Sequence, residues 1–189
     1  MKRIAVFASG NGTNAERLIR YFRDSNDVEI SLVLSNNASA GVLKRAEKLG
    51  VKSVVFSRQE FVENAEVDRL LQDNKIDFII LAGFLWLIPD FIIKGFPDRI
   101  VNIHPALLPK YGGKGMFGMN VHNSVINNGE KQSGISIHYV NSKYDEGQII
   151  FQAKVNIADK ETAETLAVKI HLLEYEHFPI IIEEVLMSF

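Results

Sequence analysis

The chain has 189 residues, a length that suits one domain with a sizeable hydrophobic core. Hydrophobic residues make up 47% and charged residues 23%, proportions that exclude a mainly disordered chain. A formal charge of -2 gives no general attraction to nucleic acid or to an anionic membrane, and the lack of cysteine excludes disulfides and cysteine nucleophiles. The first apolar run, Ile4 to Ala8, is too short for a signal peptide or a membrane span. We therefore expect a cytoplasmic protein that binds neither nucleic acid nor a membrane.

A buried strand, a glycine turn and a helix are predicted at the start of the chain. Residues 3–8 form a continuous apolar run, and Gly10 and Gly12 allow a tight turn after it. Thr13 or Asn14 is expected to cap a helix with apolar residues at helical spacing, namely Leu18, Ile19 and Phe22. Such a loop points backbone N–H groups and the positive end of the helix dipole at one place. The segment therefore predicts a phosphate-binding site.

The same segment satisfies the loose glycine pattern of dinucleotide sites, through Gly10, Gly12 and Ala15. A dinucleotide site also requires an acidic residue at the end of the second strand, which we predict at residues 28–34. That strand is followed by Ser35 and two asparagines. The sequence therefore favours a monophosphate over a dinucleotide.

Helix and strand patterns continue to alternate through the first half. We expect helices at residues 40–49, ending at Gly50, and at 60–73, with strands at 53–56 and 77–82. This alternation predicts right-handed βαβ units around a parallel sheet, whose ligands bind beyond the carboxyl ends of the strands.

The second half is expected to contain an antiparallel strand pair, unlike the parallel sheet of the first half. A short helix broken around Pro89 and a helix at 121–127 precede two strands, at 134–140 and 148–156, that pair as an antiparallel hairpin. A last helix begins at Thr162 and is strained by Pro179. The predicted fold class is α/β: a doubly wound, mostly parallel, Rossmann-like sheet in a single domain, with the hairpin near the carboxyl terminus.

Residues 100–115, IVNIHPALLPKYGGKG, join a short apolar strand to a segment that prolines and glycines keep irregular. Asn102 and His104 are two residues apart, so on an extended strand their side chains point the same way. An amide and an imidazole can donate hydrogen bonds to an oxygen that gains negative charge, and the imidazole can move a proton near neutral pH. The pair predicts acyl transfer, although a single N-x-H is more often a turn former or a structural histidine.

The remaining polar candidates are weaker when taken one at a time. Asp145 lies in a polar loop and by itself fits a solvated turn residue. We predict no metal site, because no histidine has the spacing of a metal-ligand pair. Four histidines are interpreted as surface or core side chains: His122, His138, His171 and His177.

Four motifs in this order resemble the folate-dependent glycinamide ribonucleotide formyltransferases of purine synthesis: S-G-N-G-T-N at 9–14, L-A-G-F at 81–84, N-I-H-P-A-L-L-P-K-Y at 102–111 and Y-D-E-G-Q-I-I at 144–150. The resemblance implies transfer of a formyl group from 10-formyltetrahydrofolate, as co-substrate, to the amine of 5-phosphoribosylglycinamide. It implies one formyltransferase domain over 1–189, with a phosphate-binding half at about 1–100 and a folate-binding and catalytic half at about 101–189. Small molecules are then the expected partners of a monomer or homodimer.

The resemblance also assigns roles to particular residues. The implied catalytic residues are Asn102, His104 and Asp145, with Asp145 holding the imidazole in its protonated form and helping to relay a proton. The implied phosphoribosylglycinamide-binding residues are Gly12, Thr13, Asn14 and Glu174. The implied folate-binding residues are Leu85, Trp86, Leu87, Ile88, Asn102, Asn141, Ser142, Lys143 and Tyr144.

Two features depart from the family pattern, and two kinds of alternative stay open. Trp86 stands where many members carry arginine, and the loop 112–120 is unusually rich in glycine, which is typical of a mobile lid. A methionyl-tRNA formyltransferase or formyltetrahydrofolate hydrolase would normally carry a further domain, which we expect this chain to lack. A non-catalytic nucleotide-binding module would use the glycine loop alone.

Overall fold

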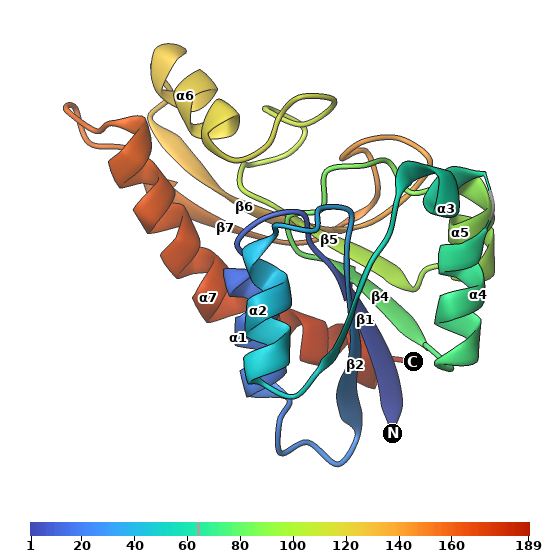
Figure 1. The fold of residues 1–189 in the computed structure, drawn as a ribbon. Helices are drawn as coiled ribbons and strands as arrows, with labels where there is room; N and C mark the ends of the chain where they lie inside the picture. Colours follow the sequence, from blue (N-terminus) through green and yellow to red (C-terminus); the bar gives the residue numbers. More distant parts are fainter. Residues whose placement is uncertain (64) are drawn as a thin grey trace. The chain divides into compact units, whose positions relative to one another are not determined.

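A computed structural model describes residues 1–63 and 65–189, which form two compact units, residues 1–101 and 102–189 (Figure 1). Parallel strand pairs in the first unit and an antiparallel pair in the second confirm the predicted α/β fold class with its late hairpin. No helix in these described residues is both long and apolar enough to cross a membrane.

The first unit contains a parallel sheet with helices on both faces (Figure 1). Its strands run in the order β3-β2-β1-β4, and their bounds are β1 Lys2–Phe7, β2 Val28–Ser35, β3 Lys52–Val55 and β4 Phe78–Leu81. The helices are α1 Thr13–Tyr21, α2 Gly41–Lys48, α3 Arg58–Val62, α4 Glu66–Asp73 and α5 Asp90–Gly95. The central strands are apolar on both sides because helices cover both faces of the sheet.

The winding direction reverses at β1, because its neighbours are β2 on one side and β4 on the other. Ligands of such sheets bind at the carboxyl ends of the strands where this reversal occurs. The loops that follow β1 and β4 meet there: the Ser9 N–H donates to the Gly83 carbonyl at 3.0 Å, and the Leu85 N–H donates to the Ser9 hydroxyl at 3.0 Å. The fold therefore places the glycine loop at the ligand-binding edge of this unit.

Two details of the first unit differ from the sequence predictions. The expected cap by Thr13 or Asn14 is wrong, because Gly12 in the left-handed region (φ 76°) precedes α1 and no side chain caps it. The single helix expected at 60–73 is two helices, α3 and α4, and residue 64 between them lies outside the described residues. Ser57 and Glu60 form a capping box at α3, which accounts for its earlier start.

The second unit is built on a hairpin covered by a long helix. Its elements are β5 Ile100–His104, which begins at the end of the first unit, α6 Met119–Asn127, β6 Gln132–Tyr139, β7 Ile149–Asn156 and α7 Ala163–Met187. The β6–β7 pairing runs from Gln132 opposite Asn156 to His138 opposite Ile149, with an irregularity just before His138. Helix α7 packs on both strands and on α6, and it continues through the buried Pro179.

Gly134 permits the close pairing of β6 with β7. A Cβ atom at this position would overlap the Ala153 carbonyl oxygen and lie 2.6 Å from Leu107 Cδ2. We expect Gly134→Ala to lower the free energy of unfolding by about 1–3 kcal/mol, because a strand backbone cannot retreat without breaking its hydrogen bonds. Chemical denaturation measures the change. Gly95→Ala is the control, since the nearest atom to its new methyl is 3.9 Å away, and equal stabilities of the two variants would contradict the expectation.

Candidate active site

The end of β5 and the loop between β6 and β7 bring together the three residues that the resemblance names as catalytic. His104 Nδ1 lies 3.6 Å from Asp145 Oδ2, and Asn102 Nδ2 lies 3.4 Å from Asp145 Oδ1. The flanking Val101 and Ile103 are buried on the strand, so alternation directs the polar pair to the same side. The side chains of Asn102 and His104 on β5 therefore both face the Asp145 carboxylate.

Asp145 is held in an uncommon backbone conformation by close contact with a glycine segment. Its φ is 55°, in the left-handed region that aspartate tolerates better than most residues. Its Oδ2 accepts a hydrogen bond from the Gly113 N–H at 2.9 Å. A Cβ at Gly112 would lie 3.0 Å from the Cβ of Asp145, so a side chain there would push the two loops apart. The glycines of the Y-G-G segment therefore let the backbone approach and orient the carboxylate.

The imidazole of His104 is buried, with 4% of its surface exposed, and its tautomer is set by a backbone carbonyl. Nε2–H donates to the Tyr111 carbonyl oxygen at 2.7 Å. The neutral ring therefore keeps its lone pair on Nδ1, the atom that faces Asp145. Nδ1 is the position at which this ring can take up a proton.

Burial decides the charge of His104 in the free protein. Loss of solvation lowers the pKa of His104, and the nearby Asp145 carboxylate and the Tyr111 hydrogen bond offset only part of that effect. Asp145 acts on this imidazole in the expected direction, but burial outweighs its effect in the free protein, and protonation of the ring during the reaction stays a prediction. The sequence could show the carboxylate as a partner, but it could not show how fully the ring is desolvated.

Asp145 itself stays ionised. Burial alone would raise the pKa of Asp145, but the neighbouring imidazoles of His138 and His104 and the Gly113 N–H together lower it. A negative charge is therefore fixed beside His104 Nδ1. In the described part of the chain, no three histidine, aspartate or glutamate side chains are grouped so that they could hold a metal ion.

His138 is a fourth member of this cluster, and the sequence analysis missed it. Its Nδ1–H donates to the Tyr139 carbonyl at 2.8 Å, which leaves Nε2 to accept a hydrogen bond from Asn102 Nδ2 at 3.1 Å. The same Nε2 lies 3.6 Å from Asp145 Oδ1. The available signal was its position at the end of a predicted strand, immediately before the loop that carries Asp145. His138 therefore orients the amide that faces the carboxylate.

A buried polar network fixes the loop that follows His104. The Ser136 hydroxyl donates to the Ala106 carbonyl at 2.7 Å and accepts from the Leu108 N–H at 3.0 Å. Gln152 Nε2 donates to the same hydroxyl at 2.8 Å and to the Leu108 carbonyl at 3.0 Å. Because these buried and part-buried groups satisfy one another, they hold the H-P-A-L-L-P turn in one conformation.

A cavity of about 520 Å³ adjoins Asp145 in the second unit and is lined by Leu108, Pro109, Gly112, Gly113, Tyr144, Asp145, Glu146, Gly147 and Ile149. Its size suits a small organic ligand, and a carboxylate and a backbone N–H face it. Of the predicted folate-binding residues it includes Tyr144. The other predicted loop residues, Asn141, Ser142 and Lys143, belong to the same connection between β6 and β7, where Asn141 accepts a hydrogen bond from the Lys143 N–H at 2.9 Å.

The remaining predicted folate-binding residues follow β4 in the first unit. Leu85 and Leu87 are each 40% exposed, whereas Ile88 is buried. Trp86 packs against Phe56, and the Arg58 guanidinium lies over its ring at 5.5 Å from the centroid. Trp86, in place of the arginine expected from the family, is thus part of an aromatic cluster that carries a cation on its surface.

The predicted phosphoribosylglycinamide-binding residues fall into two groups. Gly12, Thr13 and Asn14 lie at the junction of the glycine loop and α1 in the first unit. Glu174 is buried on α7 in the second unit, where its Oε2 lies 2.9 Å from His171 Nδ1 and raises the pKa of His171.

Comparisons with known proteins show which family the chain is similar to. The formyl transferase family profile matches residues 2–182. The chain is 37% identical to a chloroplastic phosphoribosylglycinamide formyltransferase of Arabidopsis thaliana, covering 93% of this chain and 62% of that protein, and 33% identical to the phosphoribosylglycinamide formyltransferase of Bacillus subtilis (strain 168), covering 98% and 95%. The crystal structure of phosphoribosylglycinamide formyltransferase from Streptococcus pneumoniae TIGR4 superposes with a TM-score of 0.86 at 35% identity, covering 98% of this chain and 99% of that chain.

The fold is that of an α/β protein, and the cluster around Asp145 brings an imidazole, an amide and a carboxylate together. The family profile spans nearly the whole chain, and the fold agrees with that of the solved structure. The chain belongs to the formyl transferase family.

We expect Asp145→Asn to lower the pKa of His104 further below its ordinary value. The carboxylate is the main group that raises this pKa against the effect of burial, so a neutral amide removes that support. An NMR titration of the imidazole measures the shift. Glu146→Gln, which removes an exposed neighbouring charge, is the control and should leave the titration unchanged. A rise in the His104 pKa in Asp145→Asn would contradict the electrostatic account.

Proposed function

We propose that this protein transfers the formyl group of 10-formyltetrahydrofolate to the amine of 5-phosphoribosylglycinamide, a step of de novo purine synthesis. The observation that carries the proposal is the placement of His104 Nδ1 and Asn102 Nδ2 on one ionised carboxylate, at 3.6 and 3.4 Å. The names and near-complete coverage of the bacterial relatives support the choice of substrates. The fit of a formyl-folate is supported by the cavity beside Asp145.

The reaction needs a proton acceptor and an anion-stabilising donor. The neutral amine attacks the formyl carbon, a C–N bond forms, and negative charge builds on the formyl oxygen. The new nitrogen must lose a proton, and the folate nitrogen must gain one before its bond to the formyl carbon breaks. One group that takes up a proton and later returns it satisfies both needs.

His104 is suited to that proton transfer. The free protein holds the ring neutral with the lone pair on Nδ1, so it can accept the proton of the attacking amine, directly or through water. The imidazolium then formed is stabilised by Asp145 at 3.6 Å. Its proton passes to the folate nitrogen, and the ring returns to its starting state.

Asn102 is suited to stabilise the formyl oxygen by exchanging one hydrogen bond. One hydrogen of its amide is directed to His138 at 3.1 Å and the other to Asp145 at 3.4 Å. The longer bond is the weaker one, so its hydrogen can turn to the oxyanion while His138 keeps the amide in place. Loss of one such donor commonly costs roughly 3–4 kcal/mol of transition-state stabilisation.

The two substrates would use the groups named by the resemblance. The glycine loop with Gly12, Thr13 and Asn14 would bind the phosphate, and Glu174 would bind near the glycinamide amine. The folate would contact residues 85–88 and 141–144, and residues 1–189 would act as one catalytic domain made of a phosphate-binding and a folate-binding half. The proposed enzyme works in the cytoplasm, as a monomer or homodimer, with small molecules as partners and without nucleic acid, membrane or metal.

Purified protein mixed with 10-formyltetrahydrofolate should lose the formyl group only when phosphoribosylglycinamide is added. Deformylation is followed by the absorbance of the folate product and formation of the formylated amine by mass spectrometry. Transfer to water or to charged methionyl-tRNA, with none to phosphoribosylglycinamide, would overturn the proposal in favour of a related activity.

His104→Ala and Asp145→Asn should each lower kcat by roughly several hundredfold or more, because they remove the proton carrier or its counter-charge. Thermal unfolding serves as the folding check. Asp159→Asn, which removes an exposed charge outside the cavity lining, is the control and should retain normal kcat. Unchanged turnover in both active-site variants would indicate a binding module rather than an enzyme.

His138→Phe should lower kcat about tenfold or more, with a smaller change in either KM, because the ring would keep its bulk but no longer accept from Asn102. A double variant with Asn102→Ala tests the coupling. The His138 change should have little further effect once the amide is absent, and independent, multiplying losses would contradict a positioning role for His138.

A further inference from the structure

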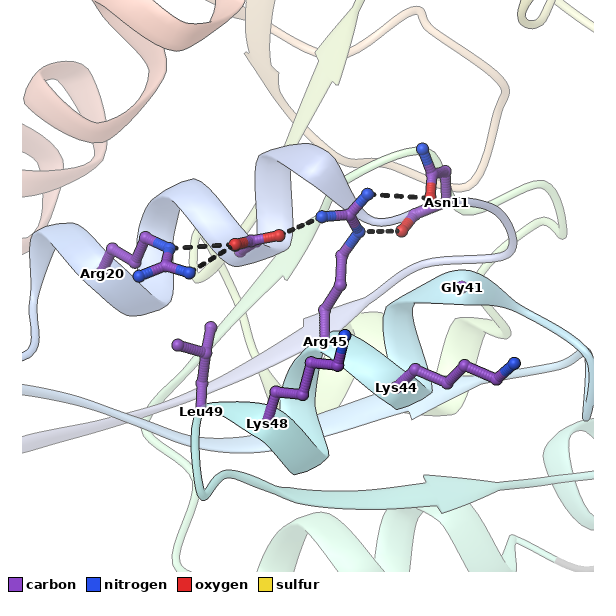
Figure 2. A pocket seen from close by; sticks show the side chains of 8 residues that line it. Asn11, Arg20, Gly41, Lys44, Arg45, Lys48 and Leu49 are labelled. Atoms are coloured by element: carbon purple, nitrogen blue, oxygen red, sulfur yellow. Dashed lines mark hydrogen bonds and ion pairs between the residues drawn. The ribbon is translucent and has the colours of Figure 1, made fainter.

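The glycine loop after β1 has a partner in α2 that the sequence did not indicate. Figure 2 shows a pocket of about 370 Å³ whose lining residues come from this loop, α1 and α2. In it the Arg45 side chain reaches from α2 to the loop and to the first turn of α1, whereas Lys44 on the same helix points away from these contacts (Figure 2). Arg45 is thus the cation that joins the three segments.

Arg45 makes three polar contacts with two elements. Its Nε donates to the Asn11 carbonyl at 2.8 Å, and its Nη2 donates to Asn11 Oδ1 at 3.0 Å. Its Nη1 pairs with Glu16 in the first turn of α1. A planar guanidinium can serve these partners at once, since its donors lie in a fixed fork.

The carbonyl contacts determine where the loop N–H groups point. In a trans peptide the C=O and the following N–H point in opposite directions. Arg45 draws the Asn11 carbonyl toward α2, so the Gly12 N–H points away from α2. The Val42 N–H donates to the Gly10 carbonyl at 3.2 Å, so the Asn11 N–H points away as well. Two successive N–H groups therefore face the side opposite α2, an arrangement that binds anions.

Close packing maintains the same orientation. A Cβ at Gly12 would overlap the Val42 side chain, and one at Gly41 would lie 2.8 Å from Asn11 Oδ1. No side chain caps α1, and contacts with α2 fix the loop that precedes it. The loop is therefore positioned by a neighbouring helix rather than by its own sequence.

The donors of Arg45 are already engaged inside the protein, by Asn11 and by Glu16. Hydrogen bonds from Arg20 and then Arg45 lower the pKa of Glu16, which stays ionised next to the guanidinium. An incoming phosphate would therefore gain more from the N–H groups that Arg45 orients than from the guanidinium donors, which already have partners. These contacts are those of a residue that positions the loop, called a brace below, and differ from those of a residue that binds the anion directly.

We propose that Arg45 is a positioning residue that aims the Asn11 and Gly12 N–H groups at the phosphate monoester of the acceptor substrate without touching the phosphate. The inference rests on the proposed function for the identity of the acceptor. It adds a residue and a physical role to the phosphate site that the glycine motif predicts.

Steady-state kinetics with both substrates varied test the proposal. Arg45→Ala should raise KM for phosphoribosylglycinamide about tenfold or more, with kcat and KM for 10-formyltetrahydrofolate nearly unchanged. Arg45→Lys keeps the charge but not the fork, so its KM should remain several-fold above that of the unmodified protein. Lys44→Ala removes a neighbouring cation and should leave KM unchanged. A KM of Arg45→Lys equal to that of the unmodified protein, or an equal rise of KM in Lys44→Ala and Arg45→Ala, would assign the role to charge and overturn the positioning role of Arg45.

A second measurement separates this inference from the proposed function. Titration with ribose 5-phosphate, followed by backbone NMR, should shift the Asn11 and Gly12 N–H signals to saturation, and saturation should need a several-fold higher ligand concentration in Arg45→Lys than in the unmodified protein. If the unmodified protein transfers no formyl group but shows this binding pattern, the proposed function is rejected and the positioning role of Arg45 is retained. Active protein with equal sugar-phosphate affinity in the unmodified chain and both Arg45 variants would reject the brace alone. Thermal unfolding shows whether each variant folds. If Arg45→Ala does not fold, the measurements on Arg45→Lys decide between a role in positioning and a role in charge.

Discussion

The candidate active site depends on one constraint: an imidazole and a carboxylate share a desolvated position at the end of a strand. Burial favours the neutral form of His104, while Asp145, supported by neighbouring donors, stays charged. The two effects leave a proton acceptor beside a counter-charge that becomes useful only after the proton arrives. A fully solvated pair would lose this difference, because water would stabilise both charged forms.

That arrangement is maintained by backbone groups as much as by side chains. The Tyr111 carbonyl selects the tautomer of His104, the Tyr139 carbonyl selects that of His138, and the Gly113 N–H holds Asp145. Main-chain groups belong to segments fixed by pairing and packing, so they cannot turn to suit a wrong tautomer. The cluster is therefore set before any substrate arrives, which is the condition for low-cost stabilisation of charge in a transition state.

In the first unit, the orientation of the glycine loop is likewise fixed by hydrogen bonds to its backbone. There the side chain of Arg45 and the N–H of Val42 engage loop carbonyls, and the trans peptide geometry directs the opposite N–H groups. Gly12 is needed because Val42 of α2 occupies the space that a Cβ would fill. In both units a glycine-rich segment carries polar groups, and a regular element beside it decides their direction. In the H-P-A-L-L-P turn, which has no glycine, the side chains of Ser136 and Gln152 on the neighbouring strands hold the backbone groups of Leu108.

The sequence by itself determined the alternation of strands and helices, the late hairpin and the side on which Asn102 and His104 point, because these follow from local periodicity and from residues with restricted backbone angles. It also indicated Asp145 through the resemblance of its motif. Only the tertiary structure decided the desolvation of His104, the inclusion of His138, the start of α1 after Gly12 without a cap by Thr13, and the contact of Arg45 with Asn11, which is 34 residues away. Desolvation and contacts between distant segments depend on how complete elements pack, and no local pattern carries that information.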